Sequence, residues 1–307
     1  MTAAPDWLVV ERGEAPLIVS VPHAGTELRE FEPRFASPWL ARKDADWWIP
    51  ELYDFARALG ATLVRATLSR SVIDVNRDPS GASLYPGQAT TELCPTTTFD
   101  GEPLYRPGEA PDAAEIAERR RRYFNPYQGA LVGEIARLRE RFPRVALFDA
   151  HSIRSRAPRL FEGELPLFNL GSNSGKSCDP ALGEAVGAVL AASGESWVVD
   201  GRFKGGWITR VYGRPERGVH ALQLELACRA YMQEPESLDE ASWPAPLDPA
   251  RADKTRATLR KVLETMLAFA GDSAATPPAP HPASPRERGE EKDGAARPSP
   301  RSRGEAG

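Results

Sequence analysis

The sequence predicts an α/β fold in which helices cover both faces of a β-sheet. Short apolar segments, typical of strands, alternate along the chain with longer segments whose apolar residues recur at helical spacing. With 307 residues and 41% hydrophobic content, the chain is also long and apolar enough to bury a substantial core. Together these two observations indicate a layered domain that folds unaided.

Six segments have the length and apolar character of strands. They span residues 16–22, 61–67, 145–151, 165–170, 196–200 and 218–226. The first is followed directly by His23 and the third ends on His151, so two of the four histidines in the chain have the same context.

Four further segments have helical spacing. They span residues 44–59, 112–141, 179–192 and 248–270. In the first, Trp48 and Leu52 lie on one apolar stripe, and Gly60 stands where helices commonly end. The third opens with an Asp-Pro pair, which is typical of a helix start.

Residues 1–270 are predicted to form a single domain, and residues 271–307 a disordered tail rich in Pro, Arg and Gly. The tail contains almost no large apolar residues, so burial cannot offset the entropy lost on ordering it.

The composition argues against several classes of partner. The net charge of -4 and the pI near 5.8 give no basic field, so nucleic acid is not an expected partner. No apolar run approaches the ~20 residues that a membrane span requires. Because the N-terminus has no signal-like segment and the three cysteines are widely separated, we expect a cytoplasmic protein.

The two strand-end histidines are candidate metal ligands. In an extended strand, residues two apart share a face, so Leu147, Asp149 and His151 point the same way. In open α/β sheets, ligands bind beyond the carboxyl ends of strands, which is where His23 and His151 emerge. Asp149 is expected either to orient a ligand or to face solvent.

A catalytic zinc site commonly has three protein ligands, so a third residue is required. Asp46, in the expected first turn of the helix after the first strand, is the first candidate. Glu27, four residues after His23, is the alternative. His220 is a weaker candidate, on the face of its strand opposite Gln223.

Glu225 is the candidate general base. It stands among leucines in the last predicted strand, and a carboxylate there requires a polar or metal partner. Two arginines suggest the substrate, because Arg77 and Arg210 each follow a strand within a polar or glycine-rich segment. Guanidinium groups pair with carboxylates, so two of them near a metal favour a dicarboxylic substrate.

Together, several motifs resemble those of the N-formylglutamate deformylase family, also called N-formylglutamate amidohydrolase. They are Pro22-His23-Ala-Gly25-Thr-Glu27, Asp44-Ala-Asp46-Trp, Asp74-Val-Asn76-Arg77-Asp78, Leu84-Tyr-Pro-Gly-Gln88, Cys94-Pro-Thr-Thr-Thr-Phe99, Asp149-Ala-His151-Ser152, Gly206-Trp-Ile-Thr-Arg210 and Gln223-Leu-Glu225. Each motif is weak alone, but their order and spacing are jointly specific over residues 8–270.

The resemblance implies hydrolysis of N-formyl-L-glutamate to L-glutamate and formate, the last step of one histidine-degradation route. It also implies distant kinship with zinc carboxypeptidases and their three-layer α/β/α sandwich around a mixed sheet, a phosphorylase/hydrolase-like fold. Carried onto this chain, it gives His23 and His151 as zinc ligands and Asp46 or Glu27 as the acidic ligand. The sequence departs here from the compact His-x-x-Glu form of those relatives.

Two further roles come from the same kinship. Asn76 and Arg77 resemble a carboxylate-binding Asn-Arg pair, and Glu225 resembles the catalytic glutamate. Two other functions stay open: a zinc deacylase or carboxypeptidase-like amidase for another N-acyl amino acid, and a non-catalytic module that binds a metal or an amino acid. Other divalent metals suit the same ligands, and the sequence predicts no oligomeric state.

Overall fold

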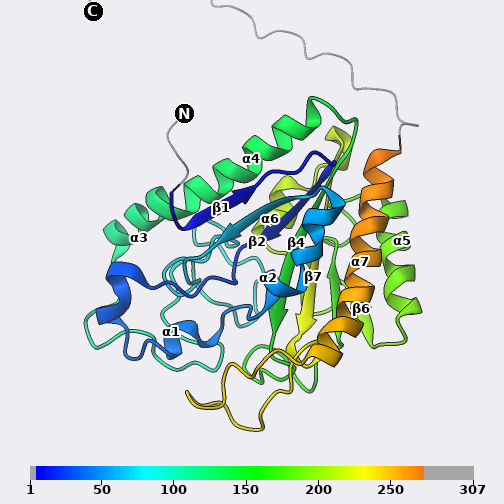
Figure 1. Ribbon diagram of the computed structural model, residues 1–307. Helices are drawn as coiled ribbons and strands as arrows, with labels where there is room; N and C mark the ends of the chain where they lie inside the picture. Colours follow the sequence, from blue (N-terminus) through cyan, green and yellow to red (C-terminus); the bar gives the residue numbers. More distant parts are fainter. Residues whose placement is uncertain (1–4, 273–307) are drawn as a thin grey trace, which may run out of the picture. The chain divides into compact units, whose positions relative to one another are not determined.

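The computed structural model describes residues 5–272, and a mixed seven-stranded sheet lies at the centre of this part of the chain (Figure 1). Its strands are β1 (Leu8–Glu11), β2 (Leu17–Val21), β3 (Thr62–Ala66), β4 (Val145–Ile153), β5 (Phe168–Gly171), β6 (Trp197–Val199) and β7 (Val219–Ala227). Their order across the sheet is β1-β3-β2-β4-β7-β5-β6. The four neighbours β3, β2, β4 and β7 run parallel, so their carboxyl ends meet at one edge.

Helices of different lengths connect the strands. The α-helices are α1 (Leu40–Lys43), α2 (Ile49–Leu52), α3 (Ala113–Arg119), α4 (Asn125–Arg139), α5 (Pro180–Ala192), α6 (Trp207–Tyr212) and α7 (Pro249–Gly271). A π-helical turn at Arg120–Phe124 joins α3 to α4, and short 3₁₀ helices span Arg29–Arg34, Asp54–Leu59, Pro215–Arg217 and Cys228–Ala230. No helix within residues 5–272 is long and apolar enough to cross a membrane.

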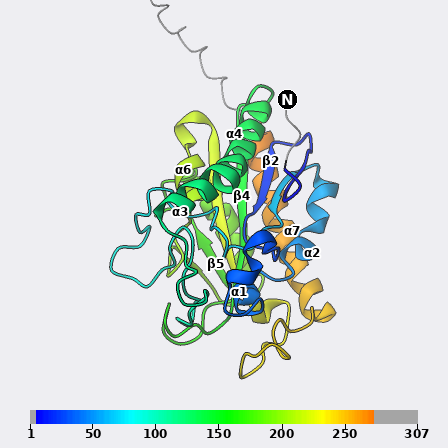
Figure 2. The same ribbon diagram turned by 90° about the vertical axis from the view of Figure 1, so that its left-hand side faces the viewer.

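The helices form a layer on each face of the sheet, as Figures 1 and 2 show together. On one face, α3, α4 and α6 pack through a core that includes Tyr127, Leu147 and Ile208. On the other face, α2, α5 and α7 pack through a core that includes Phe148 and Leu259. Because neighbouring residues of β4 enter opposite cores, the strand is buried on both faces. The predicted three-layer α/β/α sandwich with a mixed sheet is confirmed.

The structure corrects three details of the predicted elements. The helix expected over 44–59 is broken, because Trp48 adopts a left-handed φ of 65° and the chain then forms α2 and the 3₁₀ helix Asp54–Leu59. Strand β1 was not predicted, and α6 lies in a glycine-rich segment for which no helix was predicted. The predicted tail at 271–307 lies, from residue 273 onward, outside the described residues and stays a prediction.

Candidate active site

Two predicted histidines and one predicted carboxylate meet at the carboxyl ends of the parallel strands. His23 follows β2 by two residues, and His151 lies near the end of the neighbouring β4. Asp46 comes from the turn between α1 and α2, where its N–H donates to the His23 carbonyl at 3.0 Å. One potential ligand atom from each of the three buried residues lies within 4.8 Å of the others. These three residues are called the ligand group below.

His23 presents one ring nitrogen to the ligand group and hydrogen-bonds a carboxylate through the other. Its Nε2 lies 2.6 Å from Asp74 Oδ1, and because a carboxylate only accepts, Nε2 carries the hydrogen and Nδ1 keeps its lone pair. Burial and the charge of Arg70 lower the pKa of His23, which favours the neutral ring that binds metals. Although burial favours the neutral acid, the imidazole and the guanidinium groups of Arg70 and Arg77 hold the pKa of Asp74 well below its ordinary value.

His151 lies between two carboxylates. Its Nδ1 is 3.0 Å from Asp46 Oδ2, and its Nε2 is 3.0 Å from Asp149 Oδ2. Asp149 is fully buried and also accepts from Ser20 Oγ at 2.9 Å, so it faces this ring rather than solvent. Although burial disfavours the charged ring, Asp149 and Asp46 raise the pKa of His151 well above its ordinary value. A metal ion bound at Nδ1 would therefore displace a proton.

The ligand group fits a divalent metal ion. Two imidazoles and one carboxylate are a donor set that catalytic zinc sites use together with one open position. Two atoms of the group, His23 Nδ1 and Asp46 Oδ1, are buried and have no hydrogen-bond partner among the described residues. Because unpaired buried polar atoms are costly, a cation that satisfies both atoms would stabilise the site.

The other two candidate ligands lie elsewhere. The side chain of Glu27 is 44% exposed, and its carboxylate pairs with Arg29 at 2.7 Å. His220 lies near the amino end of β7, where its Nδ1 accepts from the Asp179 N–H at 3.1 Å and its ring packs edge-on against Phe269. Neither residue belongs to the ligand group.

Glu225 lies beside the ligand group. In the parallel pairing of β4 with β7 it stands directly opposite His151, so the two side chains share a face of the sheet. Burial raises the pKa of Glu225 to about 7, with His151 opposing and Asp46 reinforcing the shift. A carboxyl group with this pKa can accept and return a proton near neutral pH.

A cavity opens in front of the ligand group and Glu225. Among its lining residues are five that the sequence singled out: His23, Asn76, Arg77, His151 and Glu225. Asp46 is not a lining residue and is only 1% exposed.

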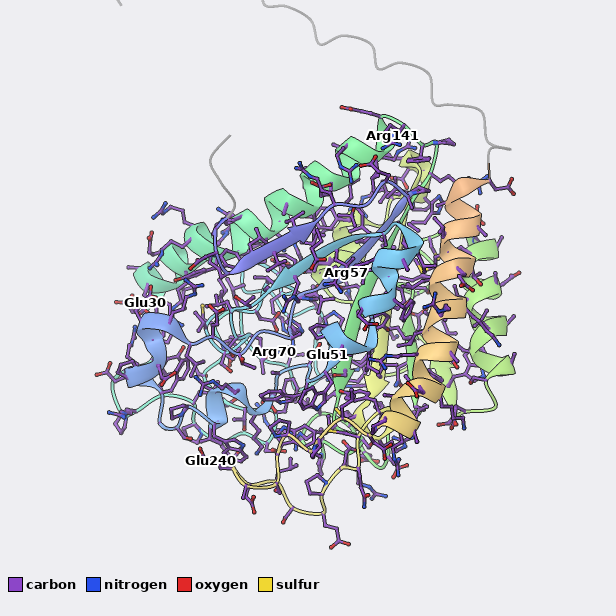
Figure 3. The ribbon with its side chains drawn as sticks, viewed as in Figure 1. Glu30, Glu51, Arg57, Arg70, Arg141 and Glu240 are labelled. Atoms are coloured by element: carbon purple, nitrogen blue, oxygen red, sulfur yellow. The ribbon has the colours of Figure 1, made fainter. Side chains whose placement is uncertain are left out.

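Arg70 also lines the cavity and was missed by the sequence analysis. It is buried in the interior of the described chain (Figure 3), where Nη2 lies 2.8 Å from Asp74 Oδ2 and Nη1 lies 3.6 Å from Asp46 Oδ1. Its guanidinium group also lies 4.9 Å from the Phe99 ring centre. The available signal was its position three residues after the predicted strand at 61–67, between two serines.

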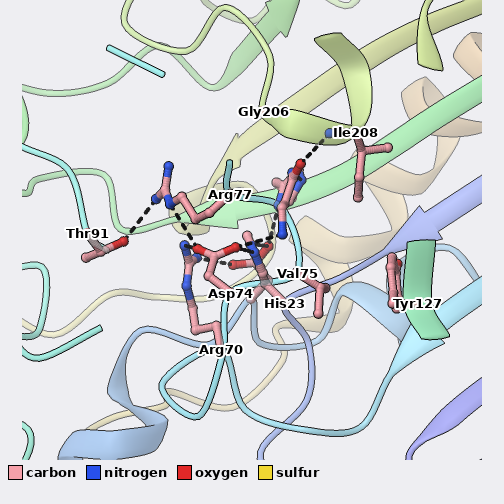
Figure 4. A network of polar contacts seen from close by, with 12 residues as sticks. His23, Arg70, Asp74, Val75, Arg77, Thr91, Tyr127, Gly206 and Ile208 are labelled. Atoms are coloured by element: carbon pink, nitrogen blue, oxygen red, sulfur yellow. Dashed lines mark hydrogen bonds and ion pairs between the residues drawn. The ribbon is translucent and has the colours of Figure 1, made fainter. Parts of the chain in front are cut away.

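Arg77 lies between Asp74 and Thr91 (Figure 4), and the neighbouring Asn76 has different contacts. Arg77 pairs with Asp74 through Nε at 3.1 Å and donates to Thr91 Oγ1 through Nη2 at 3.1 Å. The amide of Asn76 instead bridges protein groups, because Nδ2 donates to Asp149 Oδ2 at 2.8 Å and Oδ1 accepts from the backbone N–H of Ile208 in α6 at 2.8 Å.

Arg210, the second predicted substrate-binding arginine, is not among the residues that line the cavity. Its Nε–H donates to the Gly205 carbonyl at 2.9 Å, and its guanidinium lies 4.8 Å from the centre of the Tyr85 ring. Arg202, which the sequence analysis did not select, lies 5.2 Å from the same ring centre and does line the cavity. Which arginine faces the cavity depends on the path of the 200–206 segment, which no local sequence pattern specifies.

Comparisons with known proteins give a consistent result. A family model described as N-formylglutamate amidohydrolase matches residues 15–232. A protein of Pseudomonas aeruginosa named N-formylglutamate deformylase is 48% identical over 264 residues, which cover 85% of this chain and 96% of that protein. A Pseudomonas putida protein of the same name is 46% identical over 267 residues, covering 86% of this chain and 97% of that protein.

Two solved structures share the fold. The N-formylglutamate amidohydrolase of Ralstonia eutropha JMP134 has a TM-score of 0.69 and 24% identity, covering 87% of this chain and 98% of that chain. The Atu2144 gene product of Agrobacterium tumefaciens has a TM-score of 0.65 and 15% identity, covering 88% of this chain and 98% of that chain.

Proposed function

This chain belongs to the N-formylglutamate amidohydrolase family, and we propose on this basis that it is a metal-dependent hydrolase that converts N-formyl-L-glutamate to L-glutamate and formate. The observation that carries the proposal is the buried ligand group His23, Asp46 and His151, with Glu225 beside it. Zinc is the proposed metal. We further assign the reaction to the last step of a histidine-degradation route in the cytoplasm, as the sequence resemblance implies.

The metal would be held by Nδ1 of His23, Nδ1 of His151 and the carboxylate of Asp46. A divalent metal bound there polarises a carbonyl and lowers the pKa of water toward about 7. Asp74 accepts from Nε2 of His23, and Asp149 lies 3.0 Å from Nε2 of His151, so a carboxylate behind each ring helps to keep it oriented toward the ligand group.

Glu225 is the proposed proton carrier. As the C–O bond forms between water and the formyl carbon, the Glu225 carboxylate accepts the proton of the water. As the C–N bond breaks, the carboxyl group delivers this proton to the departing nitrogen, which leaves L-glutamate and formate. In the metal-free protein, burial raises the pKa of Glu225 to about 7, toward the range in which one carboxyl group can both accept and return a proton near neutral pH.

The charges around the cavity suit an anionic substrate. Arg77 is the proposed partner of a substrate carboxylate, because its Nη1 has no protein partner among the described residues. For Asn76, whose amide already bridges Asp149 and α6, we propose a supporting role rather than a bond to the substrate. For Arg210, we propose support of Tyr85 from behind the cavity wall.

The proposed activity is tested by measuring formate release from N-formyl-L-glutamate by the purified, metal-loaded protein. N-acetyl-L-glutamate, assayed by acetate release, and N-formylglycine serve as controls for the acyl group and for the second carboxylate. We expect N-formyl-L-glutamate to have the highest kcat/KM. No formate release from protein that holds stoichiometric metal would contradict the proposal, and faster turnover of the acetyl compound would assign the site to another N-acyl amino acid.

A further inference from the structure

Arg202 differs from the other two arginines of the cavity in having no carboxylate partner. Arg70 and Arg77 both pair with Asp74. Arg202 donates through Nε to the Leu160 carbonyl and through Nη2 to the Ala89 carbonyl, each at 2.8 Å, and within residues 5–272 it forms no ion pair. Both Nη1 hydrogens and one Nη2 hydrogen thus remain available to a ligand.

The surroundings of Arg202 hold its side chain in place without neutralising its charge. Its guanidinium lies 5.2 Å from the ring centres of both Tyr85 and Phe203. Burial and the nearby charge of Arg77 lower the pKa of Arg202, while Tyr85 and Glu225 partly oppose this shift, and the group stays charged at any physiological pH. A half-buried cation without a counterion is costly, and a carboxylate brought by a ligand would offset this cost.

The two arginines with free donors differ in their link to the ligand group. Arg77 is linked to the ligand group through a single residue, Asp74, which contacts both Arg77 and His23. Arg202 instead bonds the wall of the cavity, through the carbonyls of Leu160 and Ala89. In an N-acyl glutamate, the α-carboxylate is one carbon from the scissile amide nitrogen, and the side-chain carboxylate is two methylene groups farther away.

We propose that Arg202 selects substrates with an acidic side chain by binding the side-chain carboxylate of N-formyl-L-glutamate, while Arg77 binds the α-carboxylate. This assignment rests on the proposed function and adds which residue recognises the side chain of the substrate. Two N–H groups of a guanidinium match the two oxygens of a carboxylate, and a neutral amide in the same place cannot form this charged pair.

The test compares N-formyl-L-glutamate with N-formyl-L-glutamine, which has the same shape but an uncharged side chain. The variants are Arg202→Met and, as a matched control, Arg77→Met, and kcat/KM for formate release is measured for both substrates. In Arg202→Met, we expect kcat/KM for N-formyl-L-glutamate to fall roughly 100-fold or more, mainly through KM, and that for N-formyl-L-glutamine to change less than about 5-fold. In Arg77→Met, both values should fall by similar factors.

The outcomes separate this proposal from the one on which it rests. If the wild-type protein releases no formate from N-formyl-L-glutamate, the proposed function and the role of Arg202 fall together. If the wild type is active but Arg202→Met keeps its preference for the acidic substrate, or loses both substrates by the same factor, only the role of Arg202 is overturned.

A second variant covers the case in which Arg202→Met does not fold. Arg202→Lys keeps the charge and most of the aliphatic stem but cannot form two parallel hydrogen bonds. We expect it to raise KM for N-formyl-L-glutamate about 10-fold, with kcat and the kinetics on N-formyl-L-glutamine nearly unchanged. An unchanged KM for N-formyl-L-glutamate would overturn the proposal.

Discussion

The substitution Glu225→Gln separates catalysis from metal binding. Glutamine keeps the shape of the side chain but cannot accept a proton from water. Because general acid–base catalysis contributes roughly 10²–10⁴-fold, kcat should fall by about that factor. Metal content should not change, since Glu225 is outside the ligand group.

The same substitution should stabilise the metal-free protein at alkaline pH. The pKa of Glu225 rises from 4.5 to about 7 in the folded state, mainly through burial. A group with a raised pKa contributes stability below its unfolded pKa and loses it as the pH rises through the folded pKa. Each unit of pKa shift corresponds to ~1.36 kcal/mol, so the wild type should lose about 3 kcal/mol of its free energy of unfolding by pH 8. The Gln variant has no carboxyl group at this position and should not show this loss.

Three measurements check this prediction: initial rates of formate release, metal content, and denaturant unfolding of the metal-free proteins at pH 5 and pH 8. For the wild type, kcat/KM should also decline at acid pH, because a protonated Glu225 cannot accept the proton of the water. The reasoning is refuted if Glu225→Gln retains near-normal turnover with full metal content. It is equally refuted if the variant loses as much free energy of unfolding between pH 5 and pH 8 as the wild type.

Three further predictions concern the surroundings of the site. Asp74→Asn removes the carboxylate that holds the first histidine of the ligand group, so metal affinity, measured by chelator competition, should fall about 10–100-fold. Gly206→Ala places a Cβ 2.5 Å from the Asn76 amide and should lower the free energy of unfolding by about 1–3 kcal/mol, whereas Gly133→Ala, with no atom within 4 Å, should not lower it. Burial is the main cause that lowers the folded-state pKa of His220 to about 4. As the pH falls from 6.5 to 4, this residue should therefore reduce the free energy of unfolding by up to about 3 kcal/mol. A His220→Asn variant with the same pH dependence as the wild type in this range would contradict this prediction.

The strand-end residues could be predicted from the sequence because strand geometry fixes their placement. His23 follows β2 by two residues, and His151 and Glu225 belong to the neighbouring parallel strands β4 and β7. Alternation and the common carboxyl edge were therefore sufficient to predict where they lie. Asp46 was selected because a helix was predicted to begin near it, but in the structure it lies in a turn between α1 and α2. It still reaches His151, because the turn between α1 and α2 is held to the His23 carbonyl.

The cavity wall was harder to predict because long-range packing decides it. Arg202 and Arg210 lie in one glycine-containing segment and both contact the Tyr85 ring, yet only Arg202 lines the cavity. Likewise, Arg70 acquires its position from Asp46 and Asp74, which lie on different segments of the chain. Sequence spacing contains no information on such contacts. The sequence analysis therefore selected Arg77, which lines the cavity, but neither Arg70 nor Arg202.

The central claim is that this chain hydrolyses N-formyl-L-glutamate with a metal held by His23, Asp46 and His151. It is tested most directly by removing metal with a chelator and following formate release while zinc is restored in steps. We expect no activity in the metal-free protein and a rise that saturates at about one zinc per chain, with no such rise in an Asp46→Asn variant that binds zinc weakly. Full activity in protein shown to be free of metal would contradict the account.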